Sequence, residues 1–153
     1  MKKEVLEFIT PLTAEFEGFS AKVYKCPAGF DTIGYGRNIE ANPLSKEEKA
    51  KLVNGEVSKE VAKEWLEAEL SRCYDNCNNA FAWFKDLDTK RAGAIVDMAY
   101  NMGIGTLKTF KNSLAFMALQ EYDKAAENFR KSKWYSQVKR RGVRITEIIE
   151  KGE

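Results

Sequence analysis

The sequence predicts an α+β fold that is mostly α, with two lobes and a small β-hairpin near the N-terminus. Apolar residues recur at helical spacing over most of the chain, whereas a short Gly-rich stretch near residues 21–35 has strand character. At 153 residues the chain is expected to form a single domain. We expect an N-terminal lobe over about 12–60, a connecting helix over about 59–79, and a helical C-terminal lobe over about 80–153.

The first element is a helix, because apolar residues between positions 3 and 18 lie near helical spacing. Pro11 interrupts this pattern, and Thr10 is a suitable N-cap, so we expect a second short helix to start there. The helix over 1–11 is expected to pack on the C-terminal lobe. Strands over 21–24 and 32–35 follow, joined by a turn at Cys26-Pro27-Ala28-Gly29.

Helices are expected in the rest of the chain. Ser45 and Glu48 have the spacing of a capping box, and Ser58 is placed to cap the connecting helix, about five turns or roughly 30 Å long. A helix over 87–102, with little charge in its second half, is the best candidate for the core of the C-terminal lobe. Three further helices are expected over about 110–120, 122–131 and 138–150.

The charge of the chain is nearly balanced, at +2, so nothing in the total requires a nucleic-acid partner, and we expect none. It is uneven, however, because residues 129–146 contain no acid. The seven basic residues in this stretch are Arg130, Lys131, Lys133, Lys139, Arg140, Arg141 and Arg144. This pattern suits an anionic partner, but an ordinary solvated helix surface explains it equally well.

The absence of histidine excludes Ser-His and Cys-His catalysis and removes the commonest metal ligand. Cys73 and Cys77 lie four residues apart and are interpreted as small buried apolar groups, so neither a metal site nor a cofactor is expected. No segment is apolar enough to cross a bilayer, and the first residues do not resemble a secretory signal.

One short segment combines an acid, a thiol and a hydroxyl. Glu17 lies nine residues before Cys26, which lies six residues before Thr32. Cleavage of a glycosidic bond needs a proton for the leaving oxygen and a water or nucleophile on the opposite face of the sugar. Glu17, between Phe16 and Phe19, is our candidate proton donor, although a surface glutamate at a helix end is the simpler interpretation.

Cys26 could act as a general base, as a neutral group that positions water, or as a nucleophile, and we favour the first two roles. A buried structural cysteine is the alternative. Thr32 could hold a water molecule with its hydroxyl, or it could simply be a β-branched strand residue. Asp31 should point to the opposite face of the strand and would become a rival base only if the hairpin bulges there.

These motifs resemble the phage-type lysozymes of glycoside hydrolase family 24. The resemblance rests on Glu17, Cys26 and Thr32 with the Ile-Gly-Tyr-Gly run that follows, and on two later blocks, 97–114 and 125–144. It implies a lysozyme-like fold and catalytic roles for Glu17, Cys26 and Thr32. By position it also implies that four residues contact the sugar chain: Asn38, Tyr100, Ser113 and Asn128.

The resemblance further implies that Arg141 pairs with the catalytic acid. Among the departures from the common family pattern, Cys26 stands where Asp is commoner, Arg37 stands where the family usually has His, and Asp31 stands where related sequences often carry an aromatic residue. The arginine keeps a positive charge but removes a group that titrates near neutral pH.

The implied activity is that of a muramidase, hydrolysing the bond between N-acetylmuramic acid and N-acetylglucosamine in peptidoglycan with inversion, for phage-induced lysis of the host. We expect a monomer whose partner is the glycan strand, without stable membrane insertion. It would stay in the host cytoplasm until a separate membrane-permeabilising protein releases it. A lytic transglycosylase and an inactive peptidoglycan-binding module are the alternatives.

Overall fold

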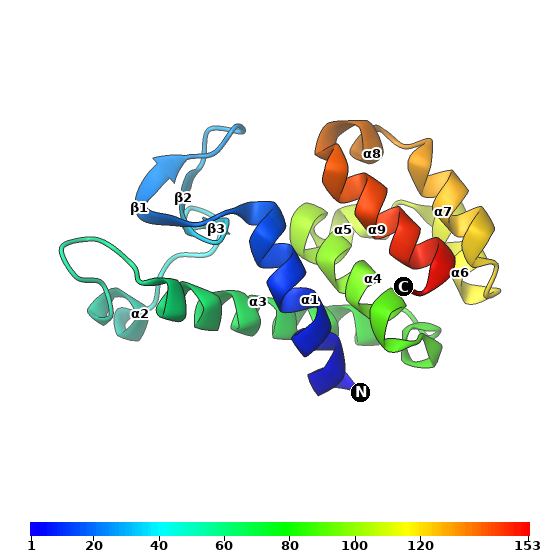
Figure 1. Ribbon diagram of the computed structural model, residues 1–153, viewed down its shortest axis with the longest axis horizontal. Helices are drawn as coiled ribbons and strands as arrows, with labels where there is room; N and C mark the ends of the chain where they lie inside the picture. Colours follow the sequence, from blue (N-terminus) through cyan, green and yellow to red (C-terminus); the bar gives the residue numbers. More distant parts are fainter. The chain divides into compact units, whose positions relative to one another are not determined.

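The computed structural model describes residues 1–153 and contains nine α-helices, a short 3-10 helix and one three-stranded antiparallel sheet (Figure 1). The predicted class, mostly α with a small sheet near the N-terminus, is confirmed. In chain order the elements are α1 (Lys2–Glu17), β1 (Ser20–Lys25), β2 (Asp31–Gly34), β3 (Arg37–Asn38), α2 (Lys46–Ala50), α3 (Lys59–Ala80), η1 (Phe84–Asp86), α4 (Thr89–Met102), α5 (Ile104–Leu107), α6 (Lys111–Ala118), α7 (Tyr122–Arg130), α8 (Lys133–Val138) and α9 (Arg140–Lys151).

The chain divides into two compact units. The N-terminal unit comprises Thr10–Glu69, and the helical unit combines Met1–Ile9 with Leu70–Glu153. Helices α1 and α3 therefore each contribute residues to both units. Lobes over 12–60 and 80–153 with a connecting helix over 59–79 were expected from the sequence, and that division remains a prediction.

Helix α1 runs without a break from Lys2 to Glu17, so the expected helix start at Thr10 was wrong. Pro11 has no N–H and removes one bond of the helical ladder. Ile9, Thr10 and Thr13 are nevertheless almost fully buried around it. Continuous burial of this face outweighs the loss of one hydrogen bond, and the helix continues to Glu17.

The sheet of the N-terminal unit has the order β1-β2-β3. Tyr24 pairs with Thr32 and Lys25 with Asp31, whereas the register is irregular between Ser20 and Tyr24. The predicted turn after β1 is confirmed by a hydrogen bond from the Gly29 N–H to the Cys26 carbonyl (2.8 Å). The third strand, β3, was not predicted, because two residues are too short to give a sequence pattern.

The core of the N-terminal unit is small and consists of Ile33, Val57, Ala62 and Trp65. Glycine is favoured at position 34 beside this core, since its φ is 67° and a Cβ there would lie 3.2 Å from the Ala62 Cβ. The capping box at Ser45 and Glu48 is confirmed, and Ser58 accepts a hydrogen bond from the Val61 N–H (3.2 Å) at the start of α3. With so small a core, this unit depends on polar contacts as well.

The helical unit is built around α4, whose residues 92–99 are all buried. The expected core helix is therefore confirmed, but it begins at Thr89, after the N-cap Asp88, rather than at residue 87. Gly93 lies against the first part of α1, since a Cβ there would come within 2.9 Å of the Phe8 ring. The close approach of these two helices depends on the missing side chain.

The helix expected over 138–150 corresponds to α9, whereas the short helix α8 before it was not predicted. Lys139 has a positive φ of 54° and separates α8 from α9. The two helices pack closely, because a Cβ at Gly142 would lie 2.9 Å from the Tyr135 ring. None of the helices combines the length and apolar character that a bilayer crossing requires.

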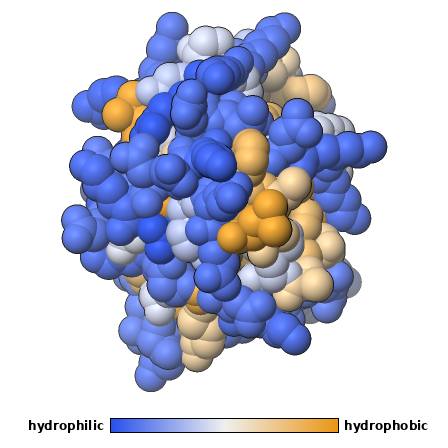
Figure 2. Space-filling model, turned by 90° about the vertical axis from the view of Figure 1, so that its right-hand side faces the viewer, coloured by the Kyte–Doolittle hydropathy of each residue, from blue (hydrophilic) through white to orange (hydrophobic).

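The face shown in Figure 2 is mostly hydrophilic, with small apolar areas between the polar side chains. The exposed large apolar residues of the helical unit are Met1, Leu119 and Val143, which are far apart in the sequence. Single exposed apolar residues of this kind are normal for a protein surface.

Candidate active site

Glu17 is the last residue of α1, and Gly18, with a φ of 73°, follows it. Its half-buried side chain lies against the backbone of Gly36, where a Cβ would come within 2.7 Å of the Glu17 Cδ. Gly36 also has a positive φ of 74°, so glycine is favoured there for two reasons. The turn between β2 and β3 therefore supports the carboxyl group that is our candidate acid.

Cys26 lies in the turn after β1, at a position where several backbone N–H groups converge on its sulfur. The N–H of Phe30 makes the largest contribution to lowering the pKa of this thiol, and the N–H groups of Ala28 and Gly29 and the Thr32 hydroxyl act in the same direction, against a smaller opposing effect of burial. Successive backbone N–H groups in a turn form an anion-binding concavity. The turn thus favours the thiolate, the form that can accept a proton.

Asp31 does not join Cys26 and Thr32. Its carboxylate pairs with Lys25 (2.8 Å), its register partner across the hairpin. The irregularity of the sheet lies further back in β1, so Asp31 and Thr32 keep opposite faces of β2. The ammonium group of Lys25, the residue before Cys26, is therefore paired with Asp31, and the pKa of Cys26 is lowered chiefly by backbone N–H groups.

Thr32 is buried, at 3% exposure, and its hydroxyl donates to the Phe30 carbonyl (2.9 Å). The same hydroxyl contributes to lowering the pKa of Cys26. A hydroxyl has only one proton, so it donates to the carbonyl or to the thiolate at any one time, while its lone pairs can still accept a hydrogen bond from water. Thr32 and Cys26 form one polar pair within the N-terminal unit.

Tyr24 is a residue that sequence reasoning did not single out. It is the register partner of Thr32, and partners in a ladder present their side chains on the same face. Burial raises the pKa of the Tyr24 phenol, and the negative charges of Glu17 and Cys26 raise it further. The phenol therefore stays protonated as a hydrogen-bond donor near both groups. Its position two residues before Cys26 on a strand was the signal that could have identified it.

The four expected sugar contacts are divided between the units. Asn38, on β3, uses its Oδ1 to accept the backbone N–H groups of Glu40 and Ala41, both at 3.0 Å. In the helical unit Tyr100 is half-buried on α4. Ser113 donates to the Asn128 Oδ1 (2.6 Å), which brings two expected contacts together.

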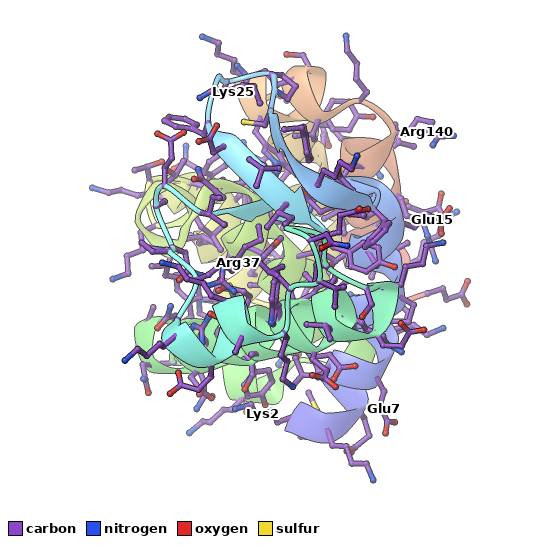
Figure 3. The ribbon with its side chains drawn as sticks, turned by 90° about the vertical axis from the view of Figure 1, so that its left-hand side faces the viewer. Lys2, Glu7, Glu15, Lys25, Arg37 and Arg140 are labelled. Atoms are coloured by element: carbon purple, nitrogen blue, oxygen red, sulfur yellow. The ribbon has the colours of Figure 1, made fainter.

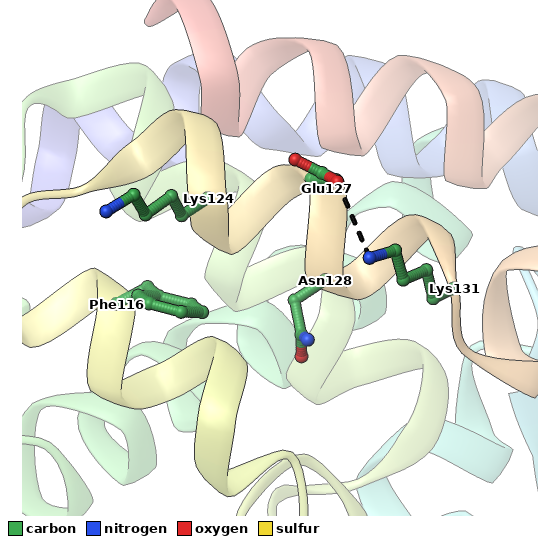
Figure 4. Close-up of a pocket in the computed structure, with 5 residues that line it drawn as sticks. All are labelled: Phe116, Lys124, Glu127, Asn128 and Lys131. Carbon is green, nitrogen blue, oxygen red and sulfur yellow. Dashed lines mark ion pairs between the residues drawn. The ribbon is translucent and has the colours of Figure 1, made fainter.

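A pocket of about 210 Å³ opens beside Asn128 in the helical unit (Figure 4). Its lining comes from α6, α7 and the residue after α7, and consists of Phe116, Lys124, Glu127, Asn128 and Lys131. Glu127 pairs with Lys131 (3.4 Å), and both side chains are largely exposed. Because Ser113 occupies the Asn128 oxygen, the amide nitrogen of Asn128 is the group that can donate to a ligand.

Arg141 is buried on α9 and donates two hydrogen bonds to Asp97, from Nε (3.0 Å) and Nη2 (2.8 Å). Asp97 has no exposed surface and was not identified from the sequence as a partner. The expected pairing of Arg141 with the catalytic acid remains a prediction.

The basic stretch is partly neutralised within the helical unit. Arg130 pairs with Glu150 (2.7 Å) and Arg144 with Glu147 (3.2 Å), in addition to the Arg141 and Lys131 pairs described above. Lys133, Lys139 and Arg140 are exposed. The structure contains no group of three or more acidic, Cys or His side chains placed to hold a metal ion.

Most of the chain matches a known protein family and several known proteins. The family model described as Phage lysozyme matches residues 14–147. The pre-baseplate central spike protein Gp5 of Enterobacteria phage T4 is 30% identical over 148 residues, which cover 87% of this chain and 26% of Gp5. The chain thus matches about a quarter of that protein.

Two proteins of Dictyostelium discoideum match along most of their own length. Probable T4-type lysozyme 1 is 29% identical over 152 residues, and probable T4-type lysozyme 2 is 27% identical over 153 residues. In both cases the match covers 89% of this chain and 89% of the relative. Together with the family match over residues 14–147, which includes Glu17, Cys26 and Thr32, this establishes that the chain belongs to the phage lysozyme family.

Proposed function

We propose that this chain is a muramidase that hydrolyses the β-1,4 bond between N-acetylmuramic acid and N-acetylglucosamine in peptidoglycan. Family membership supports the reaction class. The main structural support is the segment 17–36, which holds the Glu17 carboxyl against Gly36 and places the Cys26 sulfur beside the Thr32 hydroxyl.

In the proposed reaction Glu17 donates its proton to the glycosidic oxygen as the bond breaks. Cys26 and Thr32 hold a water molecule for attack on the opposite face of the sugar, and the thiolate accepts the proton of that water. The donors that lower the pKa of Cys26 favour this role. A water-mediated displacement of this kind inverts the configuration at the anomeric carbon.

The biological setting that we propose is lysis of a bacterial host by a phage. The enzyme would act on the glycan strand as a monomer, after a separate membrane-permeabilising protein releases it from the host cytoplasm. Family membership supports this setting.

Glu17→Gln should lower the rate of peptidoglycan hydrolysis by about 10²-fold or more, because it removes the proton donor but keeps the size of the side chain. The rate is measured as loss of turbidity of outer-membrane-stripped Gram-negative cells, followed by mass analysis of the fragments. Glu15→Gln is the matched control, since Glu15 is an exposed glutamate on the same helix. Anhydro ends in the products would indicate a transglycosylase. If the wild-type protein bound the cells without lowering their turbidity, it would be an inactive peptidoglycan-binding module.

Cys26→Asp should keep substantial activity, because a carboxylate can also accept the proton of the attacking water, whereas Cys26→Ala should lose most of it. Initial rates at several pH values test this difference. A fully active alanine variant would show that Cys26 is structural.

A further inference from the structure

Arg37, on β3, is the centre of a buried polar cluster in the N-terminal unit. Its residue exposure is 6%, and Figure 3 shows it between the small sheet and the helices of this unit, whereas Lys25 lies at the far end of the hairpin. The guanidinium donates to both carboxylate oxygens of Glu48, from Nη1 (2.8 Å) and Nη2 (3.0 Å). This two-pronged geometry fixes the orientation of both side chains.

The remaining contacts of Arg37 are with the irregular segment that follows β3 and with α3. Nε donates to the Asn42 carbonyl (3.0 Å), and Nη2 also donates to the Pro43 carbonyl (3.0 Å). The guanidinium lies over the Trp65 ring, 5.7 Å from its centroid, and Glu69 is 4.0 Å from Nε. One side chain thus connects β3, the segment after it, α2 and α3.

Both neighbours of Arg37 in the chain contact groups of the candidate active site. Gly36 lies against the Glu17 carboxyl, and Asn38 is the register partner of Thr32. Strand β3 has only two residues and two register pairs with β2, so the ladder that supports it is short. The contacts of Arg37 supply what the ladder lacks.

We propose that Arg37 is a positioning residue of the hydrolytic site. Its pair of hydrogen bonds to the Glu48 carboxylate, called the fork below, and its hydrogen bonds to the following backbone hold β3 in place. Gly36 can then support the Glu17 carboxyl, and Asn38 keeps Thr32 in register. This inference rests on the proposed function, because positioning matters for rate only if Glu17 and Thr32 act in the reaction. A displacement of about 1 Å at such groups can lower a rate by about 10²-fold.

The test compares Arg37→Lys with Arg91→Lys. Lysine keeps the charge but cannot form the planar fork. Arg91 is the matched control, since its guanidinium also bonds backbone carbonyls, those of Ile149 and Glu150, and lies over an aromatic ring, that of Tyr122, but it belongs to the helical unit. Neither Arg91 nor its partners belong to the candidate site.

Both variants should lose thermal stability. Measured well below the unfolding temperature, Arg37→Lys should lower kcat by about tenfold or more with KM nearly unchanged, whereas Arg91→Lys should leave kcat within about twofold of wild type. Unchanged kcat in a folded Arg37→Lys variant would overturn the proposal. If that variant does not fold, Glu48→Gln, which weakens the fork from the other side, decides in the same way.

A second readout does not depend on catalysis. The backbone amide resonances of Glu17 and Thr32, neither of which adjoins position 37 in the chain, should shift in Arg37→Lys and stay in place in Arg91→Lys. If wild-type protein hydrolyses no peptidoglycan, the proposed function fails, and this readout still decides whether Arg37 holds β3. Unmoved resonances in Arg37→Lys would count against the positioning role.

Discussion

Each unit contains a buried arginine that donates two hydrogen bonds to one carboxylate, but the two arginines stabilise different kinds of structure. In the helical unit, Arg141 of α9 holds Asp97 of α4, so it joins two regular helices whose apolar faces already pack. In the N-terminal unit, Arg37 holds Glu48 and also two carbonyls of an irregular segment. The first fork adds to packing, whereas the second replaces packing that a very small sheet cannot provide.

The largest expected effect is on the fork of the helical unit. Arg141→Met should lower the free energy of unfolding by about 3–5 kcal/mol, because it removes the fork from an Asp97 that has no exposed surface. Urea denaturation followed by circular dichroism measures this loss.

A double variant separates the contribution of the Arg141–Asp97 hydrogen bonds from that of helix packing. Replacing Asp97 by Leu together with Arg141→Met should recover much of the loss, because apolar packing between α4 and α9 remains. No recovery would mean that the fork itself, rather than helix packing, holds this pair of helices together.

Low pH should weaken the pairing of Arg37 with Glu48 in the N-terminal unit. Hydrogen bonding by Arg37 lowers the pKa of Glu48 from 4.5 to about 2. A carboxyl whose pKa is lowered on folding stabilises the protein above its unfolded pKa, and this stabilisation is lost as the pH falls from about 4.5 through about 2. We expect a loss on the order of 2–3 kcal/mol, since the side chain of Glu48 is 24% exposed.

The measurement is the urea midpoint between pH 6 and pH 2 for wild type and Glu48→Gln. The difference between the two proteins should shrink as the pH falls, because protonation of Glu48 removes the same charge that the variant lacks. A constant difference over this range would contradict the assignment of the acid sensitivity to Glu48.

The smallest effect concerns reactivity rather than stability and compares one thiol of each unit. Backbone N–H groups lower the pKa of Cys26, whereas burial raises the pKa of Cys77 to about 12. Iodoacetamide should therefore alkylate Cys26 at neutral pH and spare Cys77 in the folded protein, as peptide mass mapping can check. Equal labelling of the two thiols would show that the turn does not activate Cys26.

The helical unit could largely be predicted from the sequence, because its helices bury apolar faces with a clear period. The residues of α4 from 92 to 99 are an example. The short helix α8 was not predicted, since its six residues are too few to show a clear helical period.

The N-terminal unit was predicted less completely. The hairpin turn and the capping box have local signals, but β3 and the partners of Arg37 do not. Glu17, Cys26 and Thr32 could be proposed because one short segment carries all three. The lowered pKa of Cys26 could not be predicted from the sequence, because it depends mainly on main-chain N–H groups, and the residue types do not reveal the directions in which these groups point.

The donors around Cys26 have one more consequence. They belong mostly to the peptide backbone of residues 28–30, and Gly29, at a φ of 88°, shapes that backbone. Such a cradle recognises negative charge and is indifferent to whether sulfur or oxygen carries it. A carboxylate at position 26 would therefore meet the same backbone donors that now face the sulfur.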